Sequence, residues 1–236
     1  MAHQGETIEN PLSGERMTFL ETTEDTNGQY FRFEFVAPPG WAVSEHIHPR
    51  QEERTEMFSG ALDGRVAGEE IGLLPGDIRV VPPGVLHAWR NPSDEEEEAR
   101  FSVTFRPALN MESGFETSWG LARDGKATKA GVPKNPLQLA VLASEHKDEV
   151  YLPRPPIPVQ KALFAILDVL AAVGRMLGYR ARYPEYGGAD EPTGSGNESS
   201  SSSSAALRPR AVVLAATVLA IFLALLWRRR GRMSGG

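Results

Sequence analysis

Three of the five histidines and one glutamate are spaced as a metal site would require. His46 and His48 are two residues apart, so on a strand both imidazoles face the same side. Glu53 follows a short connection and can add a carboxylate from the next strand, while His87 comes from a later segment. Three imidazoles and one carboxylate suit a divalent transition metal such as Fe, Mn, Ni, Cu, Co or Zn, with water in the remaining positions. We therefore expect one such ion.

The composition narrows the classes of protein. The 236 residues contain no cysteine, which excludes disulfides, thiolate metal sites and cysteine nucleophiles. The net charge of −6 argues against a protein that coats nucleic acid, and we expect no nucleic-acid partner. A mean hydropathy of −0.31 excludes a chain that crosses membranes many times.

The elements that must position these residues are short strands. Between residues 17 and 106, segments such as 30–35 and 101–105 alternate apolar and polar side chains, the pattern of a strand with one buried face. Glycine and proline clusters separate the segments. Many short strands at even spacing predict a mainly β fold, an antiparallel sandwich or barrel.

Two gapped motifs run through these strands. The first contains Gly40, His46, His48, Glu53 and Gly60. The second contains Gly76, Pro82, Gly84, His87 and Asn91. Both match the two motifs of the cupin superfamily at every position, and the chain resembles a small single-domain cupin. The resemblance implies a jelly-roll β-barrel with His46, His48, Glu53 and His87 as metal ligands. The glycines and Pro82 would shape turns.

The register leaves some choices open. Glu52 is a rival to Glu53 as ligand, and Glu53 is preferred because it keeps the motif spacing to Gly60. Counting alternately along the strands places Thr55, Met57, Trp89 and Phe33 towards the barrel interior as candidate pocket residues. Each of these four side chains would equally serve as plain barrel core.

After Pro107 the pattern becomes helical. Asn135 followed by Pro136 predicts the start of a helix over 136–149, with His146 on a solvated face. A second helix is predicted over 159–179, with one narrow charged stripe at Lys161, Asp168 and Arg175. This helix is either buried against the barrel or lies in a membrane interface.

The C-terminal part has a different composition. Residues 187–206 are rich in Gly and Ser and predict a flexible linker. Residues 211–227 contain no charge and would form a helix of about 25 Å, the short end of a bilayer span. Trp227 and the arginines at 228–230 follow as interfacial anchors. From residue 207 onward the charge is +6, so the remainder of the chain carries −12.

The orientation of this anchor is undecided by the sequence. The arginines place the C-terminus in the cytoplasm by the positive-inside rule, whereas no export signal precedes the barrel. We favour a barrel on the cytoplasmic side of a C-terminal membrane anchor. The expected organisation is a polar arm at 1–16, a barrel at 17–106, a helical extension at 107–186, a linker at 187–206 and the anchor at 207–236.

The fold hosts many unrelated functions, so the resemblance does not select one. The first hypothesis is a dioxygenase-like metalloenzyme acting on a small organic substrate, with isomerase or lyase chemistry as variants and Glu53 as ligand and proton acceptor. The alternative is a non-catalytic, metal-stabilised module that binds a small ligand at a membrane. A regulatory sensor ranks low because the chain has no helix-turn-helix pattern. The resemblance also implies a homodimer.

Overall fold

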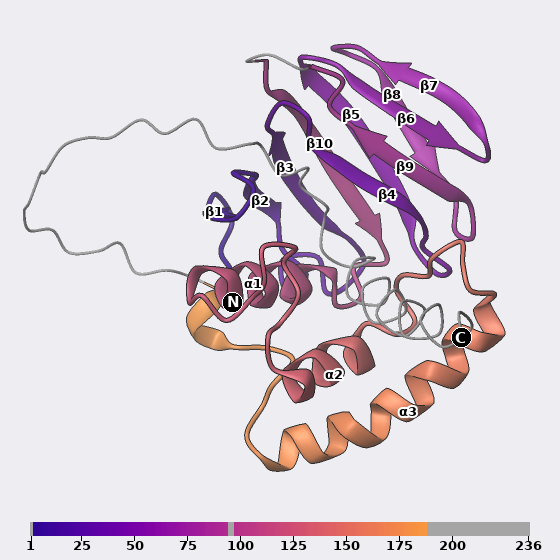
Figure 1. The fold of residues 1–236 in the computed structure, drawn as a ribbon. Coiled ribbons are helices and arrows are strands. Elements are labelled where there is room, and N and C mark those ends of the chain that lie inside the picture. Colours follow the sequence, from indigo (N-terminus) through magenta and orange to yellow (C-terminus); the bar gives the residue numbers. More distant parts are fainter. Residues whose placement is uncertain (1, 94–96, 188–236) are drawn as a thin grey trace, which may run out of the picture.

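The computed structural model describes residues 2–93 and 97–187, and two antiparallel sheets dominate it (Figure 1). Its strands are β1 (Thr7–Glu9), β2 (Arg16–Glu21), β3 (Phe31–Ala37), β4 (Ala42–Ile47), β5 (Glu52–Ser59), β6 (Leu62–Val66), β7 (Glu69–Leu73), β8 (Ile78–Val81), β9 (Leu86–Arg90) and β10 (Ala99–Arg106). The larger sheet has the order β1-β2-β3-β10-β5-β8 and the smaller one the order β4-β9-β6-β7. The predicted mainly β fold is confirmed.

The alternation in the sequence accounts for the core between the sheets. Along β3 every second residue is buried, and Phe31, Phe33 and Phe35 all point inward. β10 pairs with β3 so that Val103 lies opposite Phe33 and Phe101 opposite Phe35. The inward side chains of neighbouring strands therefore form one apolar layer, which also supplies the walls of the site described below.

The first residues are more than the polar arm predicted for 1–16. β1 pairs with β2, and both Ala2 and Ile8 are buried in the barrel core. The backbone N–H of Ala2 donates to Oε1 of Glu116, which belongs to the first helix. The sequence is polar because few residues of this segment are buried, and of these only Ala2 and Ile8 are apolar.

The helices are α1 (Met111–Arg123), α2 (Pro136–Glu145) and α3 (Ile157–Met176), followed by a short 3-10 turn at Pro184–Tyr186. The Asn135 side chain accepts hydrogen bonds from the N–H groups of Leu137 and Gln138, so the predicted cap is confirmed. α2 ends earlier than the predicted 149. The helix α1 has no counterpart among the helices that the sequence predicts.

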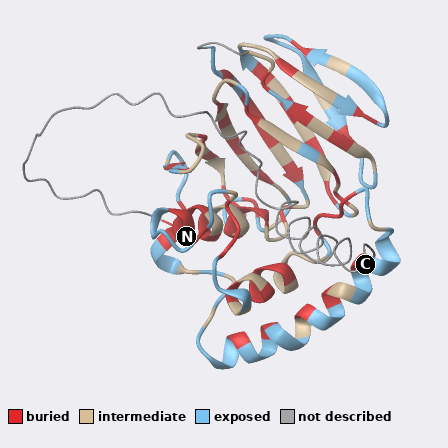
Figure 2. Cartoon of the chain, viewed as in Figure 1, coloured by how far each residue is buried: buried red, intermediate tan, exposed pale blue. Residues whose placement is uncertain are grey.

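α3 packs against α2, and the expectation that it is buried against the barrel is wrong. In Figure 1 α3 begins near the lower ends of the strands and runs away from the barrel along α2, which is the helix it packs against. Figure 2 shows α3 as a mostly exposed helix with short buried patches. By length and composition alone, α3 is the one helix of the described residues that could cross a membrane. The linker at 187–206 and the apolar segment at 211–227 lie outside the described residues, apart from Gly187.

Candidate metal centre

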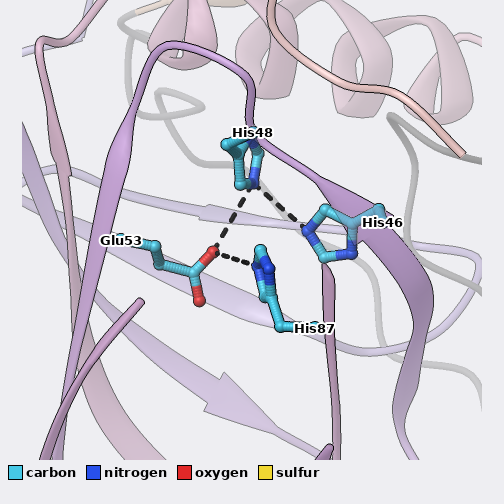
Figure 3. A group of neighbouring side chains, drawn as sticks. All are labelled: His46, His48, Glu53 and His87. Carbon is cyan, nitrogen blue, oxygen red and sulfur yellow. Dashed lines mark hydrogen bonds and ion pairs between the residues drawn. The ribbon is translucent and has the colours of Figure 1, made fainter. Parts of the chain in front are cut away.

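Four buried side chains meet between the two sheets (Figure 3). The cluster consists of His46, His48, Glu53 and His87, and one ligand atom from each lies within 4.8 Å of all the others. Oε2 of Glu53 lies 3.2 Å from Nε2 of His87 and 3.5 Å from Nε2 of His48. Nε2 of His46 lies 3.2 Å from Nε2 of His48. The four residues that the sequence singled out are therefore brought together.

Three neighbouring strands position these side chains. His46 and His87 are paired residues on β4 and β9, which places their rings on the same face of the smaller sheet. Glu53 projects from β5 of the larger sheet, and His48 lies in the turn that leads to it. Glu53 is buried and its rival Glu52 is only half-buried, so the alternation of β5 selects Glu53.

The second nitrogen of each ring fixes the tautomer. Nδ1 of His46, His48 and His87 lies 2.8, 2.8 and 3.0 Å from a backbone carbonyl oxygen, respectively. A carbonyl oxygen only accepts, so each Nδ1 is the donor and each neutral ring directs an Nε2 lone pair into the cluster. Two such lone pairs 3.2 Å apart repel unless a proton or cation lies with them. This donor set fits a divalent transition metal.

Glu53 is held from the opposite side. Its Oε1 accepts a hydrogen bond of 2.7 Å from Nε1 of Trp89 and a longer one of 3.4 Å from Oγ1 of Thr55. These two bonds occupy one carboxylate oxygen and leave Oε2 facing the imidazoles. Trp89 and Thr55, predicted as pocket residues, therefore orient the Glu53 carboxylate from within the barrel wall.

Burial and mutual charge set the protonation of the cluster. Burial, together with the charges of His48 and His87, lowers the pKa of His46 to about 3, so its ring stays neutral at ordinary pH. Burial opposes the charged form of Glu53, but the His87 charge and the imidazole hydrogen bonds hold its pKa well below the usual range. Burial also acts to lower the pKa of His87, yet the carboxylate of Glu53 raises it above its ordinary value.

An apolar cavity of about 70 Å³ adjoins the cluster, with His46, His48 and Glu53 in its wall. Of the predicted pocket residues, Phe33 and Trp89 line this cavity, whereas Thr55 and Met57 are buried in the barrel core and do not. Phe35, which shares the inward face of its strand with Phe33, also lines the cavity, as that alternation predicts. The lining residues that the sequence does not single out are Trp41, Val43, Phe101, Val103, Phe105, Met111, Phe115 and Val150. Several come from β10 and α1, which alternation counted from the two motifs does not reach.

The helical extension reaches the cluster itself. The carbonyl that accepts from Nδ1 of His48 belongs to Glu149, which is far along the chain. Next to it, Ile47 and Tyr151 exchange two backbone hydrogen bonds of 2.8 and 2.9 Å, an isolated bridge to the end of β4. The extension therefore closes one side of the barrel and fixes one of the metal-facing imidazoles.

The carboxylate of Glu149 ties the same segment to α1 and α2. It accepts from the Asn110 N–H at 3.0 Å and pairs with Nδ1 of His146 at 2.9 Å. The His146 side chain is only 18% exposed, so the predicted solvated position is wrong. It caps α2 and packs so closely on α1 that a Cβ at Gly114 would lie 2.8 Å from its ring.

The remaining motif residues shape the loops. Gly40, Gly60, Gly76 and Gly84 all have positive φ, and a Cβ at Gly60 would lie 2.6 Å from the Glu98 carbonyl oxygen. Pro82 follows directly after β8. The buried amide of Asn91 donates to the carbonyls of Ala37, Pro38 and Glu97. These contacts fix the strand ends that support β4 and β9.

With the fold and the cluster described, comparison with known proteins defines the class. Residues 33–105 match the family model of the cupin domain. This range contains all four residues of the cluster and most of both sheets. Residues 33–105 therefore match a cupin domain, and the cluster fits a metal site typical of cupins.

The relatives match over limited lengths. The chain is 32% identical over 69 residues to polyketide synthase CurC of Streptomyces cyaneus, covering 29% of this chain and 45% of that protein. It is 28% identical over 80 residues to quercetin 2,3-dioxygenase of Bacillus subtilis (strain 168), covering 34% of this chain and 24% of that protein. The chain thus spans less than half the length of these curated relatives.

Two solved structures are similar to part of this chain. An RmlC-like cupin from Shewanella frigidimarina is 24% identical, with a TM-score of 0.40, covering 46% of this chain and 89% of that chain. A predicted oxalate decarboxylase from Thermotoga maritima is 18% identical, with a TM-score of 0.39, covering 45% of this chain and 98% of that chain. In both, the matched region is less than half of this chain.

Proposed function

We propose that this chain is a membrane-anchored, metal-dependent cupin enzyme that oxidises a small organic substrate with dioxygen. The observation that carries the proposal is the position of His46, His48 and Glu53 in the wall of an apolar cavity. A transition metal bound there would supply a Lewis acid and one-electron chemistry. The likeness to quercetin 2,3-dioxygenase favours oxidation over other chemistries.

The residues of the chain have separate roles in this proposal. Phe33, Phe35 and Phe105 present ring faces and edges that bind an apolar substrate and exclude water from the cluster. Oε1 of Glu53 stays engaged by Trp89, so Oε2 is the atom that accepts a substrate proton. His48 is held in position by the Glu149 carbonyl while this happens.

The cavity size restricts the substrate. The cavity of about 70 Å³ has room for roughly five water molecules, and therefore for a substrate of a few heavy atoms. A flavonol is larger and would require Met111 and Phe115 of α1 to move. We therefore expect small dicarbonyl compounds to be oxidised in preference to flavonols.

Oxygen uptake by the metal-loaded full chain tests this proposal. The assay compares small β-diketones with flavonols, using wild type, Glu53→Gln and the neighbouring control Glu52→Gln. We expect substrate-dependent uptake that Glu53→Gln abolishes and Glu52→Gln retains, because only Glu53 lies in the cluster. If the metal-loaded protein takes up no oxygen with any of these substrates, the proposed oxidation with dioxygen is contradicted.

A non-catalytic binding module is the second candidate. The observation that favours it is the direct bond between His48 and the extension, through which a bound ion would hold the barrel and helices together. In this case metal raises stability and a small ligand binds the cavity, but no substrate is consumed. Calorimetry of the metal-loaded protein with the same compounds separates the two outcomes.

Membrane attachment is the remaining part of the proposal. Residues 211–227 carry no charge, end at Trp227 and are followed by three arginines, a pattern of a bilayer span with an interfacial end. We propose that this span anchors the chain with the barrel on the cytoplasmic side. Protease added to intact spheroplasts should leave the barrel uncut, and cleavage of the barrel there would reverse the orientation.

A further inference from the structure

The outer face of α3 is an uncharged apolar surface. Its exposed side chains include Val159, Ile166, Val169, Leu170, Val173 and Met176. Ile166, Val169 and Met176 are 62%, 66% and 86% exposed, so water covers most of each side chain. At 100° per residue these positions fall on one continuous arc of the helix. A contiguous patch of this kind marks a contact with another apolar phase.

The charged stripe of α3 lies beside α2 and away from this arc. Asp168 pairs with Lys147 at 2.7 Å, and its other oxygen accepts from the Ser144 hydroxyl at 2.5 Å. Arg175 reaches Glu145 at 3.5 Å. The polar residues that would normally solvate the outside of a helix are thus used at its border with α2.

The inner face of α3 is packed for permanent contact with α2. Its buried residues include Phe164, Leu167, Ala171 and Gly174. A Cβ at Gly174 would lie 2.9 Å from a methyl group of Val141, so the helices approach closely there. Because one side of α3 is packed against α2, the helix can lie along a bilayer surface but is not suited to crossing it.

The charge around this face is opposite to that of the chain. Residues 150–187 contain five arginine or lysine residues and two acidic ones, within a chain of net charge −6. Within the described part of the chain, the side chains of Arg154, Lys161 and Arg180 take part in no hydrogen bond or ion pair, and all three are exposed. Lys161 lies in α3, and Arg154 and Arg180 lie within four residues of its two ends. Exposed basic groups on and next to an apolar helix are complementary to anionic lipid headgroups.

We propose that the outer face of α3 docks into the interface of a bilayer that contains anionic lipid. The inference rests on the proposed anchor, which brings α3 to the membrane, and it adds an orientation. The exposed side of α3 would then face the lipid, and α2 would lie against its opposite side. A second copy of the chain, or its own segment 211–227, is the competing occupant of this face.

The absence of cysteine allows a direct test in the full chain. Val169→Cys carries a fluorophore on the outer face of α3, and Leu74→Cys carries it on the barrel as a control. The two native side chains are similarly exposed, at 66% and 62%. Each labelled protein is reconstituted in vesicles of phosphatidylcholine and phosphatidylglycerol, and quenching is measured with doxyl-labelled lipid and with acrylamide in water.

We expect doxyl lipid to quench the Val169→Cys label several-fold more than the Leu74→Cys label, and acrylamide to show the reverse order. Equal acrylamide quenching at both sites would overturn the proposal, because the face would then be in water. Protection of the Val169→Cys label from both quenchers would overturn it in favour of a protein occupant. Flotation of the vesicles tests the anchor separately. If the protein floats with the vesicles but its label is exposed to water, only the docking of α3 is refuted. If the protein does not float, both the anchor and the docking are refuted.

Discussion

The barrel interior and the outer face of α3 both depart from the usual burial of side chains. The barrel buries ionisable groups, whereas the outer face of α3 exposes apolar ones. Between the sheets, His46, His48, Glu53 and His87 are at most 6% exposed although all four are ionisable. On α3, Ile166, Val169 and Met176 are more than 60% exposed although all three are apolar. Buried polar groups and exposed apolar patches are the informative departures from ordinary burial.

The difference lies in what each region lacks. In the barrel, three imidazole lone pairs and a carboxylate face one another, and a cation would stabilise all four together. On α3, apolar side chains face water without a polar residue among them, and lipid would remove them from it. Each region thus specifies its partner by chemistry, and the predictions below test the two regions against each other.

Removing the metal should have the largest effect on stability. A ligand present at about 1,000 times its Kd stabilises the folded state by about 4 kcal/mol, which corresponds to roughly 10 °C in the Tm of a domain of this size. We expect a chelator to lower the Tm of the full chain by this order. In a His46→Ala, His87→Ala variant the chelator should change nothing; an equal shift there would place the metal elsewhere.

Loss of the bond from Trp89 to Glu53 should weaken metal binding. Trp89→Phe removes the donor that holds Oε1 of Glu53, and such outer contacts are worth about 10–100-fold in metal affinity. Trp41→Phe is the matched control, because Trp41 lines the same cavity and its indole N–H donates to none of the four cluster residues. Competition with a chromophoric chelator measures both. Equal metal affinities in the two variants would show that the bond from Trp89 to Glu53 does not contribute to metal binding.

The two faces of α3 should respond differently to substitution. Gly174→Leu forces a side chain against Val141, and overpacking of this kind costs about 1–3 kcal/mol. Val173→Gln, one position away on the exposed face, should change the free energy of unfolding by less than about 0.5 kcal/mol. Denaturant unfolding in detergent compares them. A large loss in Val173→Gln would mean that the outer face is covered by protein.

The pH dependence of metal binding should be the smallest effect. Burial acts to lower the pKa of His87, but the Glu53 carboxylate raises it above its ordinary value, so the metal-free protein keeps a proton there to higher pH than a free imidazole does. A metal must displace that proton, and affinity should therefore increase with pH, by at most about tenfold per unit, until His87 is deprotonated. Isothermal titrations at pH 6, 7 and 8 in several buffers also measure the released proton. An affinity that falls with rising pH would contradict the pairing of His87 with Glu53.

The sequence alone predicts the part of the molecule that depends on local pattern. Period-2 alternation in β3 and β10 predicts the inward aromatic layer, and the two motifs predict all four residues of the cluster. It also predicts the cap at Asn135, because an N-cap acts only on the residues that follow it. Each of these features is decided within a few residues along the chain.

Contacts between distant segments could not be predicted in this way. The carbonyl that accepts from His48 belongs to Glu149. Every residue has a backbone carbonyl, so the residue type at position 149 does not predict this contact. The helix α1 contains Gly114 and Gly120, which weaken a helical pattern, yet both allow His146 and Tyr186 to pack closely on it. The charged stripe of α3 predicts an amphipathic helix correctly but does not reveal that the stripe faces α2.

The most direct test is the metal content of the full chain before and after the cluster is removed. Purified wild type and the His46→Ala, His87→Ala variant are each loaded with Fe, Mn, Ni, Cu, Co or Zn, freed of excess ion, and analysed by mass spectrometry of the elements and of the intact protein. A His3→Ala variant serves as the control outside the cluster. The account predicts about one ion per chain in wild type and in His3→Ala, and none in the double variant. A wild type that retains no ion, or a double variant that retains as much as wild type, would contradict it.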